Sequence, residues 1–291
     1  LDDMGLSRAM VLTTAEQSNA AHEIASIIGG HAAGIYSRAT MHTPVEVTRD
    51  AVAHAREINA DCLIAVGGGS TIGLGKAITL NTALPQIAVP TTYAGSEATP
   101  ILGQTENGIK TTLIDAKVRP AAVLYDSELV TSLPISMSVT SGLNAIAHAA
   151  EGLYAREATK ATRELAVNGI RAFADGLPKV LQDPQNLQAR ENTLRGAWAC
   201  GAVLGAVGMA LHHKLCHTLG GSFNLPHAET HAIILPHAIA FNEAVAKAEL
   251  APVAQIFGDI QAGTALWTFA KSLSAPMLSL IHISEPTRLR R

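Results

Sequence analysis

The stretch CLIAVGGGSTIGLGK, residues 62–76, passes from an apolar run through three glycines into a segment of helical character. The run at 62–66 predicts a buried strand, and the turn at 67–70 is expected to open a helix that continues to about Asn81. Glycine lets the backbone approach a ligand closely, and the free N–H groups at a helix start favour an anion. The turn therefore predicts a pyrophosphate site. Its spacing matches neither the dinucleotide fingerprint nor the P-loop, and a purely structural turn is the alternative.

The N-terminal part of the chain repeats this alternation of strands and helices. Short apolar runs predict further strands at residues 9–12, 33–36 and 86–90, and helical spacing predicts helices at 15–28 and 44–58. Such alternation implies a parallel sheet that is covered by helices on both faces. The N-terminal part is therefore expected to be an α/β domain.

A second polar cluster, PTTYAGSE at residues 90–97, follows the strand predicted at 86–90. Ligands bind at the carboxyl ends of the strands of a parallel sheet. Thr91, Thr92 and Ser96 are therefore candidate donors to a phosphate or a carboxamide. A capped turn that begins a helix is the structural alternative.

The chain changes character near residues 131–134, where the strand-like runs end. Ala-rich segments, mostly separated by Gly or Pro, predict helices at 138–156, 158–175, 188–210, 211–220 and 229–247. Ala-rich helices with Gly at their close contacts are typical of a tight bundle. The C-terminal part is therefore expected to be all-α.

Histidines on these predicted helices form a pattern of their own. His213 and His217 are four residues apart and share one helix face, and His227 follows ten residues after His217. Asn144 and His148 have the same four-residue spacing on a separate predicted helix. Three convergent imidazoles with an oxygen ligand would form a divalent-metal site, whereas histidines that fill the core are the structural alternative.

The overall composition narrows the class of protein. The 291 residues are 48% hydrophobic and 15% charged, with a formal net charge of -3, which argues against nucleic acid or an anionic membrane as the main partner. Three cysteines without paired spacing indicate a reducing compartment. With no apolar run of membrane-spanning length and no signal-peptide pattern, we expect a cytoplasmic enzyme or binding protein.

The last residues differ in composition from the rest of the chain. LIHISEPTRLRR, residues 280–291, ends in a basic cluster, and we expect the segment from 278 to 291 to be a non-native tail rather than a solvated basic end. The chain begins at Leu1, and we expect it to be an incomplete form of a longer protein.

Five motifs together resemble the iron-containing (group III) alcohol dehydrogenase family. They are VGGGST at 66–71, VPTT at 89–92, NxxxH at 144–148, HxxxH at 213–217 and the Pro226-His227 pair, and their order agrees from about residue 5 to 275. Segments 90–112, 138–155 and 212–232 are similar in detail to the maleylacetate-reducing branch of that family. The resemblance implies a dinucleotide-binding α/β domain over 1–132 and a helical catalytic domain over 133–277, in the dehydroquinate synthase-like arrangement with the active site in the cleft between them.

The resemblance also implies roles for individual residues. His217 corresponds to a catalytic histidine near the nicotinamide, and the positions of the metal ligands in metal-dependent relatives are held here by Asn144, His148, His213 and His227. The pyrophosphate turn comprises Gly67, Gly68, Gly69, Ser70 and Thr71, with Thr91 and Thr92 on the nicotinamide side. Thr14 stands where many relatives have an aspartate for the adenosine ribose, so NADPH is expected to be accepted beside NADH.

Asn144, in place of the family aspartate, changes the expected chemistry. Reduction of an isolated ketone benefits from a divalent Lewis acid, whereas hydride addition to a conjugated carbon–carbon double bond gives a delocalised enolate that hydrogen-bond donors stabilise. The resemblance to the maleylacetate-reducing branch implies NAD(P)H-dependent reduction of maleylacetate to 3-oxoadipate, in the breakdown of aromatic compounds. With Asn144 in place of the aspartate, we expect this reaction to require no metal. His217 is the expected proton donor or oxyanion partner, with His148, His213 and His227 as supporting donors.

The remaining expectations concern the substrate, the assembly and the alternatives. Lys110 and Lys214 are candidate partners of the substrate carboxylates, and Tyr93 is expected either to pack near the nicotinamide or to fill the cleft wall. A homodimer is expected. The alternatives are a metal-dependent alcohol or hydroxyacid dehydrogenase, an inactive nucleotide-binding fragment, and a dehydroquinate-synthase-like lyase, which would need a metal site and a basic pocket.

Overall fold

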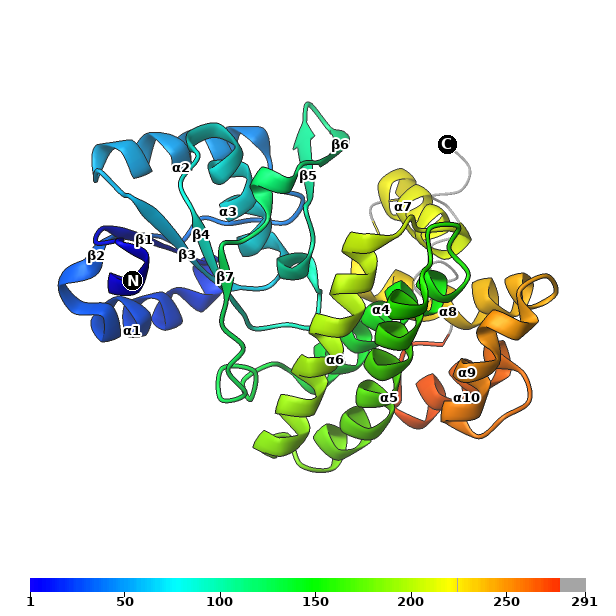
Figure 1. Cartoon of the computed structure of the whole chain (residues 1–291). Coiled ribbons are helices and arrows are strands. Elements are labelled where there is room, and N and C mark those ends of the chain that lie inside the picture. Colours follow the sequence, from blue (N-terminus) through cyan, green and yellow to red (C-terminus); the bar gives the residue numbers. More distant parts are fainter. Residues whose placement is uncertain (224, 278–291) are drawn as a thin grey trace. The chain divides into compact units, whose positions relative to one another are not determined.

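The computed structural model describes residues 1–223 and 225–277, in two compact units that divide between Leu133 and Pro134 (Figure 1). The segment predicted to be a non-native tail, residues 278–291, lies outside the described residues.

The N-terminal unit is built on a five-stranded sheet with the strand order β2-β1-β3-β4-β7. Its strands are β1 (Ala9–Leu12), β2 (Ala32–Tyr36), β3 (Cys62–Gly67), β4 (Gln86–Pro90) and β7 (Ala122–Val123). Every neighbouring pair in the sheet is parallel. The parallel α/β architecture expected from the sequence is therefore confirmed, and β7 is a short edge strand that the apolar pattern did not reveal.

Both faces of this sheet are apolar because successive side chains of a strand point in opposite directions. Met10 and Leu12 of β1 pack in one core, which also holds residues of α2 (Val45–Glu57) and α3 (Gly69–Thr82). Val11 of β1 packs in a second core with residues of α1 (Ser18–Ile28). Helices therefore cover both faces, and the carboxyl ends of the strands stay available for a ligand.

A separate two-stranded hairpin interrupts the strand–helix pattern after β4. Its strands, β5 (Ile101–Glu106) and β6 (Ile109–Ile114), are antiparallel. The turn between them is Asn107-Gly108, and both residues have positive φ. An Asn-Gly pair between two strands is the strongest short-range signal of a hairpin, and the sequence analysis did not use it.

The C-terminal unit contains only helices among its described residues, which confirms the expected all-α part. They are α4 (Ile135–Leu153), α5 (Lys160–Gln182), α6 (Leu187–Ala206), α7 (Leu211–Phe223), α8 (His227–Glu243), α9 (Lys247–Phe257) and α10 (Ala262–Ser272). The first five correspond to the predicted helices with shifted ends, and α9 and α10 were not anticipated. Among the described residues, the short 3-10 helices all lie in the N-terminal unit. They are η1 (Asp2–Met4), η2 (Ala15–Gln17), η3 (Gly29–His31), η4 (Ser96–Ala98) and η5 (Ala116–Val118).

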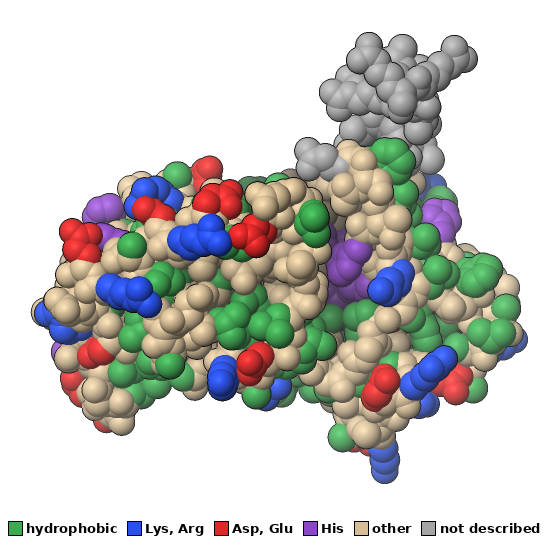
Figure 2. Space-filling view, turned by 90° about the horizontal axis from the view of Figure 1, so that it is seen from above, with side chains coloured by type: hydrophobic (Ala, Val, Ile, Leu, Met, Phe, Trp, Pro, Cys, Tyr) green, Lys and Arg blue, Asp and Glu red, His purple; other side chains and the backbone are tan. Residues whose placement is uncertain are grey.

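The surface and the helix lengths bear on possible partners. Figure 2 shows basic and acidic side chains interspersed over the face that it draws, rather than gathered by sign. Within the described residues, no single helix is long and apolar enough to cross a membrane. The pair α6 and α7 meets those criteria only when joined across a bend of 93°.

Close helix packing in the C-terminal unit depends on glycine. A Cβ atom built on Gly152 of α4 would overlap the side chain of Val203 of α6. We expect Gly152→Ala to lower the free energy of unfolding by about 1–3 kcal/mol, the usual cost of overpacking a core. Urea unfolding followed by circular dichroism measures this change. In the Val203→Ala background, which removes the obstructing methyl groups, the same glycine substitution should cost clearly less; an equal cost in both backgrounds would contradict this account.

Candidate active site

The glycine turn joins the end of β3 to the start of α3. Gly67 is the last residue of β3 and has a φ of 156°, and Gly68 is the N-cap of α3 with no side-chain cap. A Cβ on Gly67 would overlap Thr71, and a Cβ on Gly68 would lie 2.9 Å from Cγ2 of Thr92. The backbone is therefore open at a helix N-terminus, where amide N–H groups and the helix dipole favour an anion.

The ends of β1, β3 and β4 meet at this turn. The backbone N–H of Thr91 donates to the carbonyl of Gly67 (3.1 Å). The side-chain amide of Gln17 donates to Oγ1 of Thr91 (3.1 Å), so the residues after β1 contact the residue after β4. The structure thus brings together the predicted glycine turn and the predicted threonines, and it adds Gln17, which sequence reasoning missed.

Thr14, the predicted ribose-side position, is the N-cap of η2. Glu16 follows two residues later, and hydrogen bonds from its own backbone N–H and from the Thr14 side chain lower the pKa of its carboxyl. The carboxylate of Glu16 therefore lies close to Thr14, the position at which this chain lacks the aspartate of many relatives. The sequence contained this signal, as the acidic residue in Thr14-Ala15-Glu16.

A buried lysine supports the loop after β4. Nζ of Lys76, which lies on α3, donates to the carbonyls of Ser96 (2.6 Å), Thr99 (2.9 Å) and Ile101 (2.9 Å). Burial lowers the pKa of Lys76 to about 7, and the nearby Glu97 carboxylate opposes that shift. The sequence analysis did not assign a role to Lys76, although this lysine is the last residue of the glycine-rich motif. The reason is that its hydrogen-bond partners lie 20 to 25 residues away in the chain.

In the C-terminal unit, the predicted histidines form one cluster. The ring centroids of His148 on α4 and His213 on α7 are 5.0 Å apart, and those of His213 and His217 are 6.1 Å apart. His217 in turn stacks on His227, the first residue of α8, at 6.1 Å. The helices α4, α7 and α8 therefore bring together the four histidines that the sequence singled out, and Asn144 lies one helical turn before His148.

The predicted ligand residues fit a divalent metal ion. Three of their buried atoms have no hydrogen-bond partner in the structure: Asn144 Oδ1, His148 Nδ1 and His213 Nε2. The 5.0 Å between the rings of His148 and His213 is compatible with a shared ion at metal–nitrogen distances of about 2.0–2.1 Å. Burial, and then the neighbouring His213, holds the pKa of His148 well below its usual range, so this ring is available as a neutral ligand.

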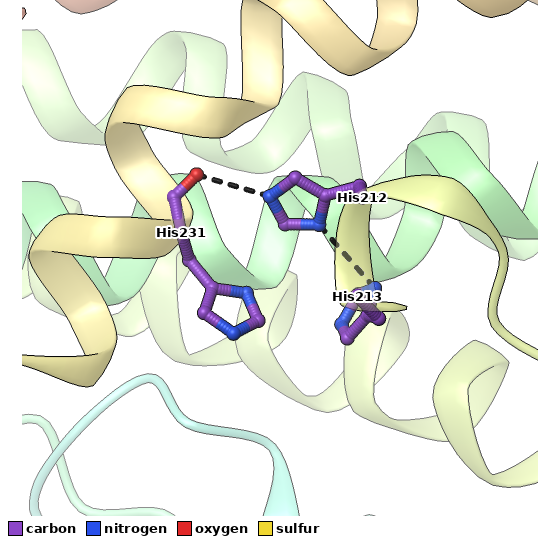
Figure 3. A group of neighbouring side chains, drawn as sticks. All are labelled: His212, His213 and His231. Carbon is purple, nitrogen blue, oxygen red and sulfur yellow. Dashed lines mark hydrogen bonds between the residues drawn. The ribbon is translucent and has the colours of Figure 1, made fainter. Parts of the chain in front are cut away.

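Two further histidines, His212 and His231, belong to the same cluster, and sequence reasoning missed both (Figure 3). Their ring centroids are 4.9 Å apart, and each is also in contact with His213. Nε2 of His212 lies 3.0 Å from the carbonyl oxygen of His231, so this nitrogen carries the proton and donates. Burial, and then His213, lowers the pKa of His212 to about 4. His212 is therefore a neutral, hydrogen-bonded core residue.

The group His212, His213 and His231 lies close enough to be considered as a metal site by itself. We disfavour it because Nε2 of His212 is already bound to a carbonyl and Nδ1 of His213 is 2.6 Å from Oε2 of Glu151. His231 differs, because both of its ring nitrogens are buried without a partner and burial strongly lowers its pKa. It is a neutral imidazole with a free donor and a free acceptor, one turn after His227.

Two of the three candidate substrate residues adjoin predicted site residues in the chain. Tyr93 follows Thr92, and Lys214 follows His213. Lys110 is on β6 and Lys214 is on α7, and both are exposed. Tyr93, in the loop after β4, is fully buried. Although the Lys110 side chain is exposed, partial desolvation by its neighbours lowers its pKa below the ordinary value. None of these observations assigns the three residues to a substrate, and their roles stay predictions.

Sequence comparisons now place the chain in a class. Residues 1–127 match the family described as iron-containing alcohol dehydrogenase, and residues 138–282 match the C-terminal region of the same family. The chain belongs to the iron-containing alcohol dehydrogenase family and is an oxidoreductase, as the five motifs suggested.

Particular relatives are closer still. A maleylacetate reductase from Rhizobium sp. (strain MTP-10005) is 58% identical over 273 residues, which are 94% of this chain and 78% of that protein. The crystal structure of a maleylacetate reductase from Agrobacterium tumefaciens superposes with a TM-score of 0.94 at 56% identity, covering 96% of this chain and 80% of that one. A sulfoacetaldehyde reductase from Bifidobacterium kashiwanohense, solved in complex with NAD+, has a TM-score of 0.86 over 100% of this chain and 86% of its own, but at 20% identity it shows only the shared fold.

Proposed function

We propose that this protein reduces maleylacetate to 3-oxoadipate with NADH or NADPH. The observation that carries the proposal is the cluster of imidazoles with the amide of Asn144, in which several polar atoms on three helices are buried without a hydrogen-bond partner. The imidazole N–H groups of such a pocket can donate to a dianionic enone, and the neutral amide of Asn144 adds no repelling carboxylate at that position. Sequence identities of 58% and 56% to two proteins named maleylacetate reductase support the same substrate.

Residues of both units take part in the proposed reaction. The glycine turn of the N-terminal unit, Gly67 to Thr71, would hold the pyrophosphate at the open start of α3, and Thr91 and Thr92 would orient the nicotinamide. A bound dihydronicotinamide would supply the hydride. Addition of that hydride to the alkene carbon remote from the ketone would move the electron pair of the double bond to the ketone oxygen as an enolate. The imidazole of His217 donates a hydrogen bond or a proton, and the carbon next to the ketone is then protonated.

A metal ion is compatible with this site. Asn144, His148, His213 and His227 would hold it, and a bound ion would supply Lewis-acid stabilisation of the oxygen. Membership of an iron-containing family does not support the expectation that no metal is required. We nevertheless propose that the reduction proceeds without one, because an enolate spreads its charge and Asn144 supplies no anionic ligand.

Activity measurements with and without a chelator test the proposal. We expect the purified protein to oxidise NADH when maleylacetate is added, and to keep that rate after exhaustive chelation. A loss of activity that Zn²⁺ or Fe²⁺ restores would contradict the metal-independent reaction. Activity with NAD⁺ and simple alcohols but none with maleylacetate would instead support the alternative, a metal-dependent alcohol dehydrogenase.

The preference between cofactors and the assembly remain predictions. Thr14 stands in place of the aspartate that would reject the 2′-phosphate of NADPH. The carboxylate of Glu16, two residues later, is the nearby acidic group that could oppose this phosphate. We propose that NADPH is used beside NADH. We also propose a homodimeric assembly and a cytoplasmic location, as expected from the sequence.

A further inference from the structure

Glu151 is a fully buried carboxylate on α4, one turn after His148. Its oxygens are hydrogen-bonded on both sides. Oε1 accepts from the backbone N–H of His212 (2.7 Å), and Oε2 accepts from the backbone N–H of Ala210 (2.9 Å). Oε2 also lies 2.6 Å from Nδ1 of His213, and the Tyr154 hydroxyl donates to Oε1 at 3.4 Å.

Two of these contacts fix the beginning of α7. The helix starts at Leu211, so the N–H groups of Ala210 and His212 have no acceptor within the helix. A carboxylate at a helix N-terminus satisfies such donors and interacts favourably with the helix dipole. Because Glu151 comes from α4, it ties the start of α7 to the helix that carries Asn144 and His148.

The third contact decides where the proton of His213 lies. An ionised carboxylate can only accept, so Nδ1 of His213 must carry the hydrogen. Both oxygens of Glu151 already accept backbone N–H groups, from Ala210 and His212, and these donors stabilise the ionised carboxylate. Nδ1 of His212, 3.3 Å away, is an acceptor because His212 donates through Nε2. In the neutral ring, Nε2 of His213 then holds a lone pair, and this buried atom has no partner in the structure.

We propose that Glu151 is a positioning residue that fixes His213 as the Nδ1–H tautomer and presents its Nε2 lone pair beside His148. The effect expected on kcat rests on the proposed function, whereas the tautomer assigned to His213 does not. A neutral His213 in this tautomer accepts a hydrogen bond or binds a cation. It therefore does not donate to the enolate, which differs from the supporting-donor role predicted from the sequence. The nearest rings that can still donate are then His148 at 5.0 Å and His231 at 5.1 Å between ring centroids, followed by His217 at 6.1 Å.

The Glu151→Gln variant tests this assignment. Glutamine keeps the shape of the side chain but presents one acceptor and one donor group, and the donor opposes Nδ1–H. Two-dimensional ¹⁵N–¹H spectra of the imidazole nitrogens report the tautomer, and the signal of His213 is assigned by its absence in His213→Gln. We expect the Nδ1–H form in the unmodified protein and a shift towards Nε2–H in Glu151→Gln. The kcat for maleylacetate should fall by roughly 10–100-fold with unchanged NADH affinity.

Glu243 provides a matched control. Its carboxylate accepts from the backbone N–H groups of Ala262 (2.8 Å) and Gly263 (3.4 Å) at the start of α10, so Glu243→Gln also removes a charged cap from a helix. This variant should lower the urea midpoint without changing kcat or the spectrum of His213. The conservative Glu151→Asp variant, which keeps the acceptor charge, should retain the Nδ1–H form and recover part of the activity.

Some outcomes overturn the proposal regardless of any variant's stability. An Nε2–H signal for His213 in the unmodified protein would do so even if Glu151→Gln failed to fold. An unchanged tautomer in a folded Glu151→Gln, or an equal loss of kcat in Glu243→Gln, would show that Glu151 acts only as a cap. A protein that shows the predicted tautomer but does not reduce maleylacetate would contradict the proposed function and leave the positioning role standing.

Discussion

Replacing His217 with alanine is expected to lower kcat for maleylacetate by roughly 10²–10⁴-fold, the usual contribution of a positioned general acid or base. His217 lies at the exposed side of the histidine cluster, whereas His148 and His213 are buried. Its ring centroid is 6.1 Å from those of both His213 and His227, so it joins the buried part of the cluster to the part that solvent reaches. A ring in that position can meet a substrate and exchange its proton with water.

Steady-state kinetics together with NADH fluorescence titration measure the effect. The loss should appear in kcat, and the affinity for NADH should stay within about threefold of its original value, because the pyrophosphate turn is in the other unit. His237, an exposed histidine on α8, serves as the control, and His237→Ala should keep the full rate. A His217→Ala variant with nearly unchanged kcat would remove this residue from the mechanism.

The second large effect is expected from Gly67→Ala, which should weaken NADH binding by about 100-fold. Gly67 has a φ of 156°, and a Cβ there would overlap Thr71 in the first turn of α3. The strain of forcing alanine into this conformation costs about 1–3 kcal/mol, so the turn is expected to rearrange. Rearrangement moves the N–H groups away from the pyrophosphate, and losing one or two charge-assisted hydrogen bonds costs about 3 kcal/mol, which is roughly 100-fold in affinity.

Isothermal titration of NADH into the variant measures this loss. Gly258→Ala is the matched control, because Gly258 also has a positive φ of 74° but lies at the end of α9 with open space around its Cβ position. The control should lose stability and keep NADH affinity. If both variants bound NADH as tightly as the unmodified protein, the turn at 67–71 would not be the pyrophosphate site.

The sequence was most informative where a local period or a glycine determines the backbone. The apolar runs at 9–12, 62–66 and 86–90 predict β1, β3 and β4, because a strand buried on both faces has no polar alternation. The helical spacing of the C-terminal part predicts five of its helices. The predictions failed where the signal was short, as at the edge strand β7, or was overlooked, as at the Asn107-Gly108 turn of the β5–β6 hairpin.

For the site, the sequence by itself determined which residue types are available and which share a helix face. The four-residue spacings of Asn144 with His148 and of His213 with His217 required nothing beyond helix geometry. The tertiary structure decided which groups meet those side chains. Glu151 reaches His213 across 62 positions of sequence, and His231 joins the cluster from a third helix. A hydrogen-bond partner is set by distances of about 3 Å between separate helices, so only the packed fold determines which nitrogen of His213 holds its proton.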